Sequence, residues 1–367
     1  MLEVLATFVA LAFVIVFAGT FLARYADALG ELTGMGRSLA GLVLLALATS
    51  LPELATDCNA ALIGAIDLAA GDLLGSCLFN LLILGILDMM FRSRGRMLSP
   101  QTAAHALGAI TSILITSIAL LFILWRVDVS VWGIGVGSFV VAACYLFCLR
   151  WVYADHRFGI SDLMAPAVEA PGVEQYTLKR ATLGYLATTA VIFAAAPLLA
   201  RTAEHLSEVS GLGGTFIGTT LLALTTSLPE LVTTYSALRM GSFDLAVGNI
   251  FGSNCFNMAI LFGVDTFYRD GPLLAEISPI HAVTAVAVII VTAVATMGLL
   301  YRAEKPLLAH RTRCRPGDRA RHRRTRARLS PRRLRASSSA ATDTGQYHNA
   351  DEQKHSRRVR RGSHCAL

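Results

Sequence analysis

The sequence TSLPE occurs at residues 49–53 of this chain and again at residues 226–230. It is part of a longer repeat, because residues 41–88 align without a gap onto residues 218–265, with about half of the positions identical. A second polar element, Gly-Ser-x-x-Phe-Asn, returns at the same offset in both copies. Repeated apolar segments interrupted at matching positions are typical of transporters whose binding site lies between the repeats.

The composition indicates a membrane protein with many spans. Of its 367 residues 54% are hydrophobic, and the mean hydropathy of +0.57 is too high for one soluble core. We expect the first apolar stretch to be a retained helix, because it has no basic n-region and no small-residue cleavage site. Nine stretches are long enough to cross a membrane: roughly residues 2–22, 38–65, 68–91, 103–125, 130–152, 182–200, 215–238, 245–267 and 280–300.

The basic residues between these stretches predict the orientation in the cell membrane. With the N-terminus outside, ten Lys or Arg residues fall in cytoplasmic connections and three fall outside. Five crossings separate the two copies of the repeat, so the second copy enters the membrane in the opposite sense. We predict an all-α polytopic membrane protein with an inverted-topology repeat of five helices, and with helices that are discontinuous at the midplane. The expected parts are helices 1–5 in residues 1–152, a cytoplasmic loop in residues 153–181, and helices 6–9 in residues 182–302.

Residues 303–367 differ from the rest of the chain. From Arg302 onward there are nineteen Lys or Arg residues against five acidic ones, with no helical or strand periodicity. This composition predicts a basic, disordered, cytoplasmic tail. By analogy with the first repeat a tenth helix should follow Leu300, but the sequence turns Arg-rich instead, so we predict that the second repeat lacks its last helix. Two origins of the tail remain open, a natural cytoplasmic extension or translation of a GC-rich gene in the wrong frame.

The first copy of TSLPE has the chemistry of a cation site. Pro52 lies in the middle of an apolar segment and cannot donate a backbone hydrogen bond, so we expect the helix to break or kink there. Such a break would free carbonyl oxygens from Ala46 to Thr49 at membrane depth, beside the hydroxyl of Ser50 and the carboxylate of Glu53. Carbonyl, hydroxyl and carboxylate oxygens together suit hard cations such as Ca²⁺ or Na⁺.

The helix after each acidic element supplies a second polar wall. Its polar residues are spaced i, i+4 and i+8, which places them on one face. They are Asp72, Ser76 and Asn80 in the first copy, and Asn249, Ser253 and Asn257 in the second.

Glu53 and Glu230 are the strongest functional candidates. A charge at the midplane costs roughly 2.5 to 3.5 kcal/mol on insertion scales, so two carboxylates at equivalent positions indicate a function. Two copies related by a pseudo-two-fold axis would bring these carboxylates together, and two negative charges match one divalent cation. Their repulsion in the absence of the cation would couple release of one ion to uptake of another.

Other polar residues have plainer interpretations. A proline kink alone, or a single membrane Asn, often serves only packing. We expect Asp67 and Asp244 to be helix N-caps, and His105 and His281 to lie at the interface rather than to relay protons. Asp57 either lines an outer vestibule or reaches the interface, and both remain open. The seven cysteines show no metal-ligand spacing and imply no disulfide framework.

At these residues the chain resembles the sodium/calcium exchanger family of the calcium/cation antiporter superfamily. The two alpha-repeats of that family carry Thr-Ser-Leu-Pro-Glu and Gly-Asn-x-x-Gly-Ser-Asn-x-x-Asn elements, and the resemblance covers about residues 1–300. It implies a ten-helix fold with alternating access, and Ca²⁺ ligation by Glu53 and Glu230 with help from the carbonyls of Thr49 and Thr226. Sodium sites would use Ser50, Ser76, Ser227, Ser253 and the carbonyls of Ala46 and Ala223, with Asn80 and Asn257 on the inner wall.

Three departures from the family pattern bear on ion selectivity and stoichiometry. Asp72 and Cys77 stand where Asn is usual, and the last position of the second element is Asn in both copies. The sequence favours a secondary antiporter that exchanges Ca²⁺ for Na⁺. A proton-coupled calcium/cation antiporter and a non-transporting or defective truncated homologue remain alternatives. The expected partners are calcium ions, sodium ions and the lipid bilayer; we expect no resident cofactor, no enzymatic activity and no nucleic-acid partner.

Overall fold

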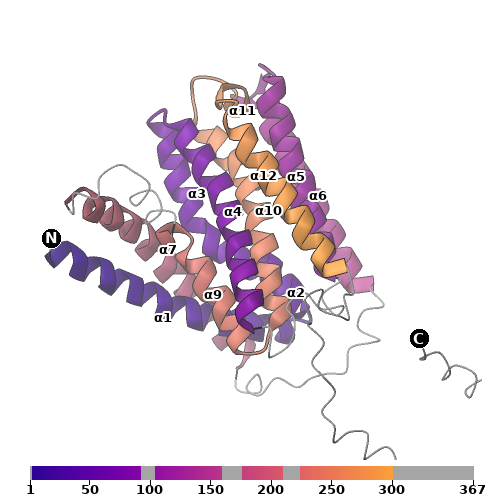
Figure 1. Ribbon diagram of the computed structural model, residues 1–367. Coiled ribbons are helices and arrows are strands. Elements are labelled where there is room, and N and C mark those ends of the chain that lie inside the picture. Colours follow the sequence, from indigo (N-terminus) through magenta and orange to yellow (C-terminus); the bar gives the residue numbers. More distant parts are fainter. Residues whose placement is uncertain (1, 92–103, 159–175, 210–223, 301–367) are drawn as a thin grey trace, which may run out of the picture. The chain divides into compact units, whose positions relative to one another are not determined.

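The computed structural model describes residues 2–91, 104–158, 176–209 and 224–300, and these residues are almost entirely helical (Figure 1). Within this part of the chain, eight helical segments are long and apolar enough to cross a membrane, which agrees with eight of the nine predicted spans. The protein is therefore a multi-pass membrane protein. The segments are α1 (Leu2–Leu32), the combined α2, η1 and α3 (Gly36–Leu62), α4 (Ile66–Phe91), α5 (Ala104–Trp125), α6 (Val136–Phe158), α7 (Leu178–Val209), α10 (Phe243–Phe267) and α12 (His281–Leu300).

The helix was predicted to break or kink at Pro52, and of these two the break is wrong for the first copy. The segment consists of α2 (Gly36–Leu39), a π-helical stretch η1 (Ala40–Leu45) and α3 (Ala46–Leu62), and α3 continues through Pro52. The irregular backbone of this segment is the π-helical stretch η1, which lies before Pro52. π-Helical turns inside α-helices often occur at functional sites. Pro52 removes only its own backbone donor, and the hydroxyl of Thr49 donates to the carbonyl of Leu45 at 3.0 Å.

The second copy does break at its proline, as predicted. Residues 224–226 are helical, Ser227 lies in a turn with φ −88° and ψ 10°, and α9 begins at Leu228 and ends at Arg239. Pro229 falls in the first turn of α9, where the missing N–H costs nothing. The ninth predicted span, roughly residues 215–238, is described only from residue 224 onward.

Equivalent glycines end α3 and α9. Gly64 has φ +76° and Gly241 has φ +82°, in the left-handed region that favours glycine after a helix. The chain then enters α4 in the first copy and α10 in the second. Both copies of the repeat thus form a helix, a tight turn and a second helix.

Helix α10 lies at the centre of the packing, and α1 lies at its edge. In the most apolar window of each helix, 83% of the α10 residues are buried, against 17% in α1. Gly252 and Gly248 let α10 approach η1 and α2, since a Cβ on Gly252 would collide with the carbonyl of Leu42 and one on Gly248 would lie 2.5 Å from that of Ser38. Small residues of this kind permit close helix crossings in membranes.

The connections at the helix ends carry specific polar contacts. A hairpin of β1 (Ser130–Val131) and β2 (Ile134–Gly135) precedes α6 and is the one sheet among the described residues. Asp265, at the end of α10, accepts the backbone N–H of Gly135 at 3.0 Å and of Leu273 at 3.1 Å, where α11 (Leu273–Glu276) begins. Its counterpart in the first copy, Asp88, has an Oδ1 atom without a hydrogen-bond partner.

Two histidine–aspartate pairs connect the repeats to each other. His105 Nε2, in the first turn of α5, lies 3.1 Å from Asp244 Oδ1 in the first turn of α10. His281 Nε2, at the start of α12, lies 3.4 Å from Asp67 Oδ1 in the first turn of α4. The N-cap prediction for Asp244 is wrong, because Ser242 occupies the cap position of α10 and Asp244 instead pairs with a histidine of the other repeat.

The loop predicted at residues 153–181 is narrower at both ends, because α6 runs to Phe158 and α7 begins at Leu178. Residues 159–175, and the predicted tail at residues 303–367, lie outside the described residues.

Candidate cation-binding site

The two TSLPE elements meet inside the protein. Glu53 on α3 and Glu230 on α9 are 3% and 1% exposed, and Ser50 Oγ donates a hydrogen bond of 3.4 Å to Glu230 Oε1. Thr49 Oγ1 lies 3.4 Å from Ser253 Oγ on α10. These contacts join residues about half the chain apart, so the structure brings together the acidic element of one copy and both elements of the other.

Buried oxygen atoms without partners gather at this place. Both carboxylate oxygens of Glu53 lack a hydrogen-bond partner, and so does Glu230 Oε2. Buried polar groups are nearly always paired, since leaving one unpaired costs about 1 to 3 kcal/mol. Further unpartnered buried oxygens lie on α3, α4 and α10 and in the turn before α9: those of Asp57, Asp72, Asn80, Ser227, Asn249 and Asn257.

The charged side chains gathered at the site are carboxylates. Glu53 is repelled by Glu230, Asp72 and Asp57. In the described part of the chain, the ion pairs join Arg37 to Asp27 and Glu31 and the two histidines to Asp67 and Asp244, and none involves a carboxylate of the site. Two like charges about 4 Å apart repel by about 4 kcal/mol at an effective dielectric constant of 20. A positive ion would relieve this repulsion.

The ligands of such an ion would be mixed. Among the described residues no three Asp, Glu, His or Cys side chains are grouped closely enough to hold one metal ion. Hydroxyl and carbonyl oxygens would therefore complete a shell around two carboxylates. This donor set fits a hard cation and is unsuited to zinc or copper.

The polar wall on α4 and α10 is arranged partly as predicted. Ser76, Asn80, Ser253 and Asn257 are buried on these helices. Asn80 Nδ2 donates to Asn254 Oδ1 at 3.0 Å, and Asn254 Nδ2 donates to the carbonyl of Cys77 at 3.2 Å. Sequence reasoning missed Asn254, although its repeat position, occupied by Cys77 in the first copy, was available as a signal. Asn254 fixes the amide of Asn80 so that the Asn80 carbonyl oxygen stays unpartnered.

The remaining predicted ligands have different surroundings. The carbonyl of Ala46 accepts a long contact of 3.4 Å from Thr49 Oγ1, so it is not freed by a helix break. Thr226 is half-buried before the turn and Ser227 is buried within it. Ala223 lies outside the described residues.

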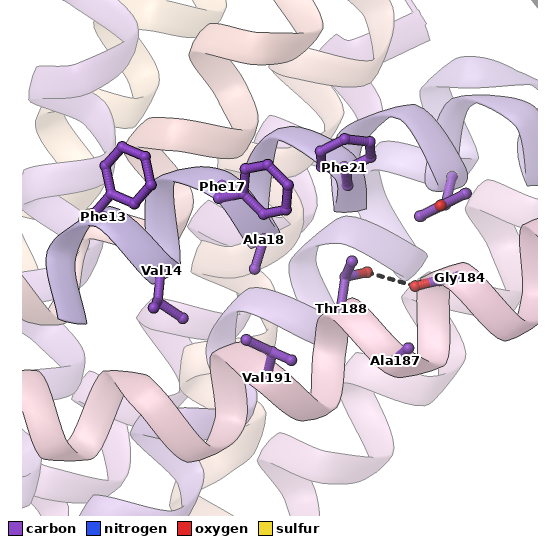
Figure 2. A pocket seen from close by; sticks show the side chains of 10 residues that line it. Phe13, Val14, Phe17, Ala18, Phe21, Gly184, Ala187, Thr188 and Val191 are labelled. Carbon is purple, nitrogen blue, oxygen red and sulfur yellow. Dashed lines mark hydrogen bonds between the residues drawn. The ribbon is translucent and has the colours of Figure 1, made fainter. Parts of the chain in front are cut away.

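A separate groove between α1 and α7 is not part of this site. It has a volume of about 520 Å³ and is lined by apolar side chains such as Phe13, Phe17 and Val191 (Figure 2). Thr188, its one hydroxyl residue on α7, donates its proton to the carbonyl of Gly184 at 2.8 Å. The lining contains no carboxylate, so this groove offers no charge to a cation.

Comparisons with known proteins agree with this geometry. The family model described as sodium/calcium exchanger protein matches residues 3–152 and 180–312. CaxA of Alkalimonas amylolytica is 30% identical over 232 residues, which is 63% of this chain and 70% of CaxA. The sodium/calcium exchanger MaX1 of Methanosarcina acetivorans is 47% identical over 62 residues, which is 17% of this chain and 18% of MaX1. The solved structure of the sodium-calcium exchanger NCX_Mj soaked with Na⁺ and Sr²⁺ has the same fold, with a TM-score of 0.61 at 18% identity over 81% of this chain and 91% of that one.

Proposed function

Since the chain belongs to the sodium/calcium exchanger family, whose members are cation antiporters, we propose that it exchanges Ca²⁺ for Na⁺ across the cell membrane by alternating access. The observation that carries this proposal is the set of unpartnered carboxylate oxygens on Glu53 and Glu230, buried where both copies of the repeat meet. Carboxylates in such a place need a cation.

Each predicted ligand has a role in this proposal. Glu53 and Glu230 bind Ca²⁺ from two sides, with the carbonyls of Thr49 and Thr226 completing the shell. Sodium ions bind to hydroxyl and carbonyl oxygens around the same centre and displace Ca²⁺ by neutralising the two carboxylates in its place. These sodium ligands are Ser50, Ser76, Ser227, Ser253, Ala46 and Ala223, with Asn80 and Asn257 on the inner wall and Asp72 adding negative charge.

The exchange follows from the repulsion between the carboxylates. A site with both glutamates ionised and no cation is unfavourable, so the protein changes between its two open states mainly when cations fill it. Release of Ca²⁺ to one side is then coupled to uptake of Na⁺. No resident cofactor and no chemical step is needed for this cycle.

Proton-coupled antiport is the second candidate. The four carboxylates of Glu53, Glu230, Asp57 and Asp72 have no basic partner among the described residues, and protons neutralise carboxylates as sodium ions do.

Flux measurements distinguish the two. In proteoliposomes at constant pH, an outward Na⁺ gradient should drive the purified protein to take up ⁴⁵Ca²⁺. An inward Na⁺ gradient should drive release of the accumulated ⁴⁵Ca²⁺. Uptake that follows an imposed pH gradient and ignores Na⁺ would favour the proton-coupled cycle. Absence of uptake under both gradients, from protein that is folded and inserted, would contradict the antiport proposal.

We propose that the N-terminus lies outside the cell and that the basic tail is cytoplasmic, which the distribution of Lys and Arg supports. Cysteine accessibility at the two ends of α1 in oriented vesicles tests this orientation.

A further inference from the structure

Asp57 and Asp72 have neutral counterparts in the second copy, and those counterparts touch. At the positions of Asp72 and Asp57 the second copy has Asn249 and Thr234. Asn249 Nδ2 donates to Thr234 Oγ1 at 2.9 Å, which joins α10 to α9. The repeat thus has a place where the second helix of the unit contacts the first through these two side chains.

In the first copy the same place holds two carboxylates. Asp57 is 1% exposed and its Oδ2 atom has no hydrogen-bond partner; the Oδ2 atom of Asp72 is also buried and unpartnered. By the equivalence of the two copies, Asp72 stands to Asp57 as Asn249 stands to Thr234, and two ionised carboxylates in such positions repel each other. The first copy therefore has two buried acceptors at the positions where the second copy has a donor and an acceptor.

The neighbouring hydroxyl does not relieve this conflict. In the second copy Asn249 also donates to Thr233 Oγ1, at 3.1 Å, while Thr233 donates its own proton to the carbonyl of Pro229. Its counterpart Thr56 likewise donates to the carbonyl of Pro52, at 3.0 Å. With its proton engaged there, Thr56 offers only an acceptor oxygen, and an ionised Asp72 has no proton to donate to it.

We propose that Asp57 and Asp72 hold a second hard cation, Na⁺ or Ca²⁺, beside the ion held between Glu53 and Glu230. This inference rests on the proposed function only for the existence of the central ion. Asp57 and Asp72 both belong to the first copy, on α3 and α4, whereas the central ion lies between glutamates of different copies, so we treat Asp57 and Asp72 as a position of their own. The unpartnered and deeply buried carboxylate of Asp57 supplies the strongest ligand.

A second ion also balances the charge of the site. Four ionised carboxylates carry twice the charge of one divalent cation, and the described part of the chain supplies no basic side chain to pair with them. The cation at Asp57 and Asp72 would reduce the repulsion that both exert on Glu53.

The second copy provides the control variant. Asp57→Thr together with Asp72→Asn gives the first copy the residues that form a hydrogen bond in the second, so this variant should fold. Binding is read from the thermal unfolding of the full chain in detergent, with NaCl or CaCl₂ compared with N-methyl-D-glucamine chloride at constant ionic strength. A background of Glu53→Gln with Glu230→Gln removes the central site.

The expected result is that cations still raise Tm in the Glu53→Gln and Glu230→Gln background, and that adding Asp57→Thr and Asp72→Asn removes this rise. If cations raise Tm equally with and without Asp57 and Asp72, or if the rise follows pH and not the cation, the second site does not exist. Since the measurement reads binding, failure of transport would not affect it.

A second measurement covers the case in which the combined variant is unstable. Equilibrium dialysis with ²²Na⁺ and with ⁴⁵Ca²⁺ should give about one more bound ion per chain for the wild type than for Asp57→Thr with Asp72→Asn. Equal numbers of bound ions would overturn the proposal.

Discussion

The two copies of the repeat share the TSLPE element, but the backbone and the hydrogen bonds around its glutamate differ between them. In the first copy α3 runs unbroken through Pro52, and Glu53 has no hydrogen-bond partner for either oxygen. In the second copy the helix breaks at Ser227, and Glu230 accepts a hydrogen bond from Ser50 of the first copy. The first copy also carries Asp57 and Asp72, where the second carries neutral side chains.

This difference indicates that the two copies of the repeat have different roles at the site. At the positions of Asp57 and Asp72 the second copy is neutral and hydrogen-bonded, because the Asn249 amide donates to both Thr233 and Thr234. The first copy concentrates unpartnered negative charge. A cation would therefore interact more favourably with the carboxylates of the first copy. In the second copy, the break at Ser227 is a place where the helix can change direction.

The largest effect should come from removing either glutamate. Glu53→Gln and Glu230→Gln should each abolish calcium exchange while leaving membrane insertion intact, because each removes half of the charge that faces the divalent ion. The loss of a buried charge partner costs about 2 to 5 kcal/mol, enough to end measurable transport. ⁴⁵Ca²⁺ uptake by purified variants in proteoliposomes is the measurement, and full uptake by either would sink the site assignment.

A binding experiment on Ser50 sharpens the comparison between the two glutamates. Ser50→Ala removes the hydrogen bond to Glu230 and none to Glu53, so it should weaken Ca²⁺ binding by about 1 kcal/mol, far less than loss of a glutamate. Calorimetric titration with Ca²⁺ measures it. In a Glu230→Gln background Ser50→Ala should have a smaller effect, and an unchanged effect there would mean that Ser50 acts elsewhere.

Asp72 should have an intermediate effect. Asp72→Asn restores the residue of the second copy and should weaken cation affinity without ending transport, since the glutamates remain. The dependence of uptake on Ca²⁺ concentration at several pH values checks this. An unchanged dependence would leave Asp72 with a packing role alone.

The sequence predicted the helices and the meeting of the two repeats, because apolar length and the repeated acidic element are local and strong signals. It could not predict that Pro52 and Pro229, within identical five-residue elements, behave differently. In the first copy the helix before Pro52 packs against α10 at Gly248 and Gly252, and such a tertiary contact cannot be read from the five residues of the element. The pairing of His105 with Asp244 was missed for the same reason, because the partners lie far apart in the chain.

The two histidine pairs should contribute unequally to stability. The His105 side chain is 1% exposed and its Nδ1 atom also lies 3.2 Å from Ser38 Oγ, whereas His281 is 15% exposed. Double-mutant cycles of thermal unfolding, with His→Gln and Asp→Asn, should give a coupling of about 1 kcal/mol for the first pair and a few tenths for the second. Equal couplings would show that burial does not set their strength.

The smallest effect is expected at the end of the chain. Nineteen cationic side chains cannot enter hydrocarbon without great cost, so residues beyond about 305 should add no packing to the membrane helices. Cleavage after Leu300 should therefore leave Tm and transport unchanged. Unfolding on cleavage, or protection of this segment from protease in inside-out vesicles, would contradict the prediction.

A second experiment at the same end of the chain adds a helix instead of removing the tail, and it rests on the difference between Asp265 and Asp88. Asp265 accepts the backbone N–H of Gly135, just before α6. Asp88 Oδ1 has no partner, and α12 exposes Val283, Val294 and Met297. By the symmetry of the repeat, a helix placed after α12 as α6 follows α5 would reach Asp88 and cover that face. Fusing such a helix after Leu300 should raise Tm, and Asp88→Ala should remove part of the gain, because the new N–H donors would then lack the carboxylate that accepts them. A gain in Tm that is identical with and without the Asp88→Ala substitution would show that the added helix docks without using this carboxylate.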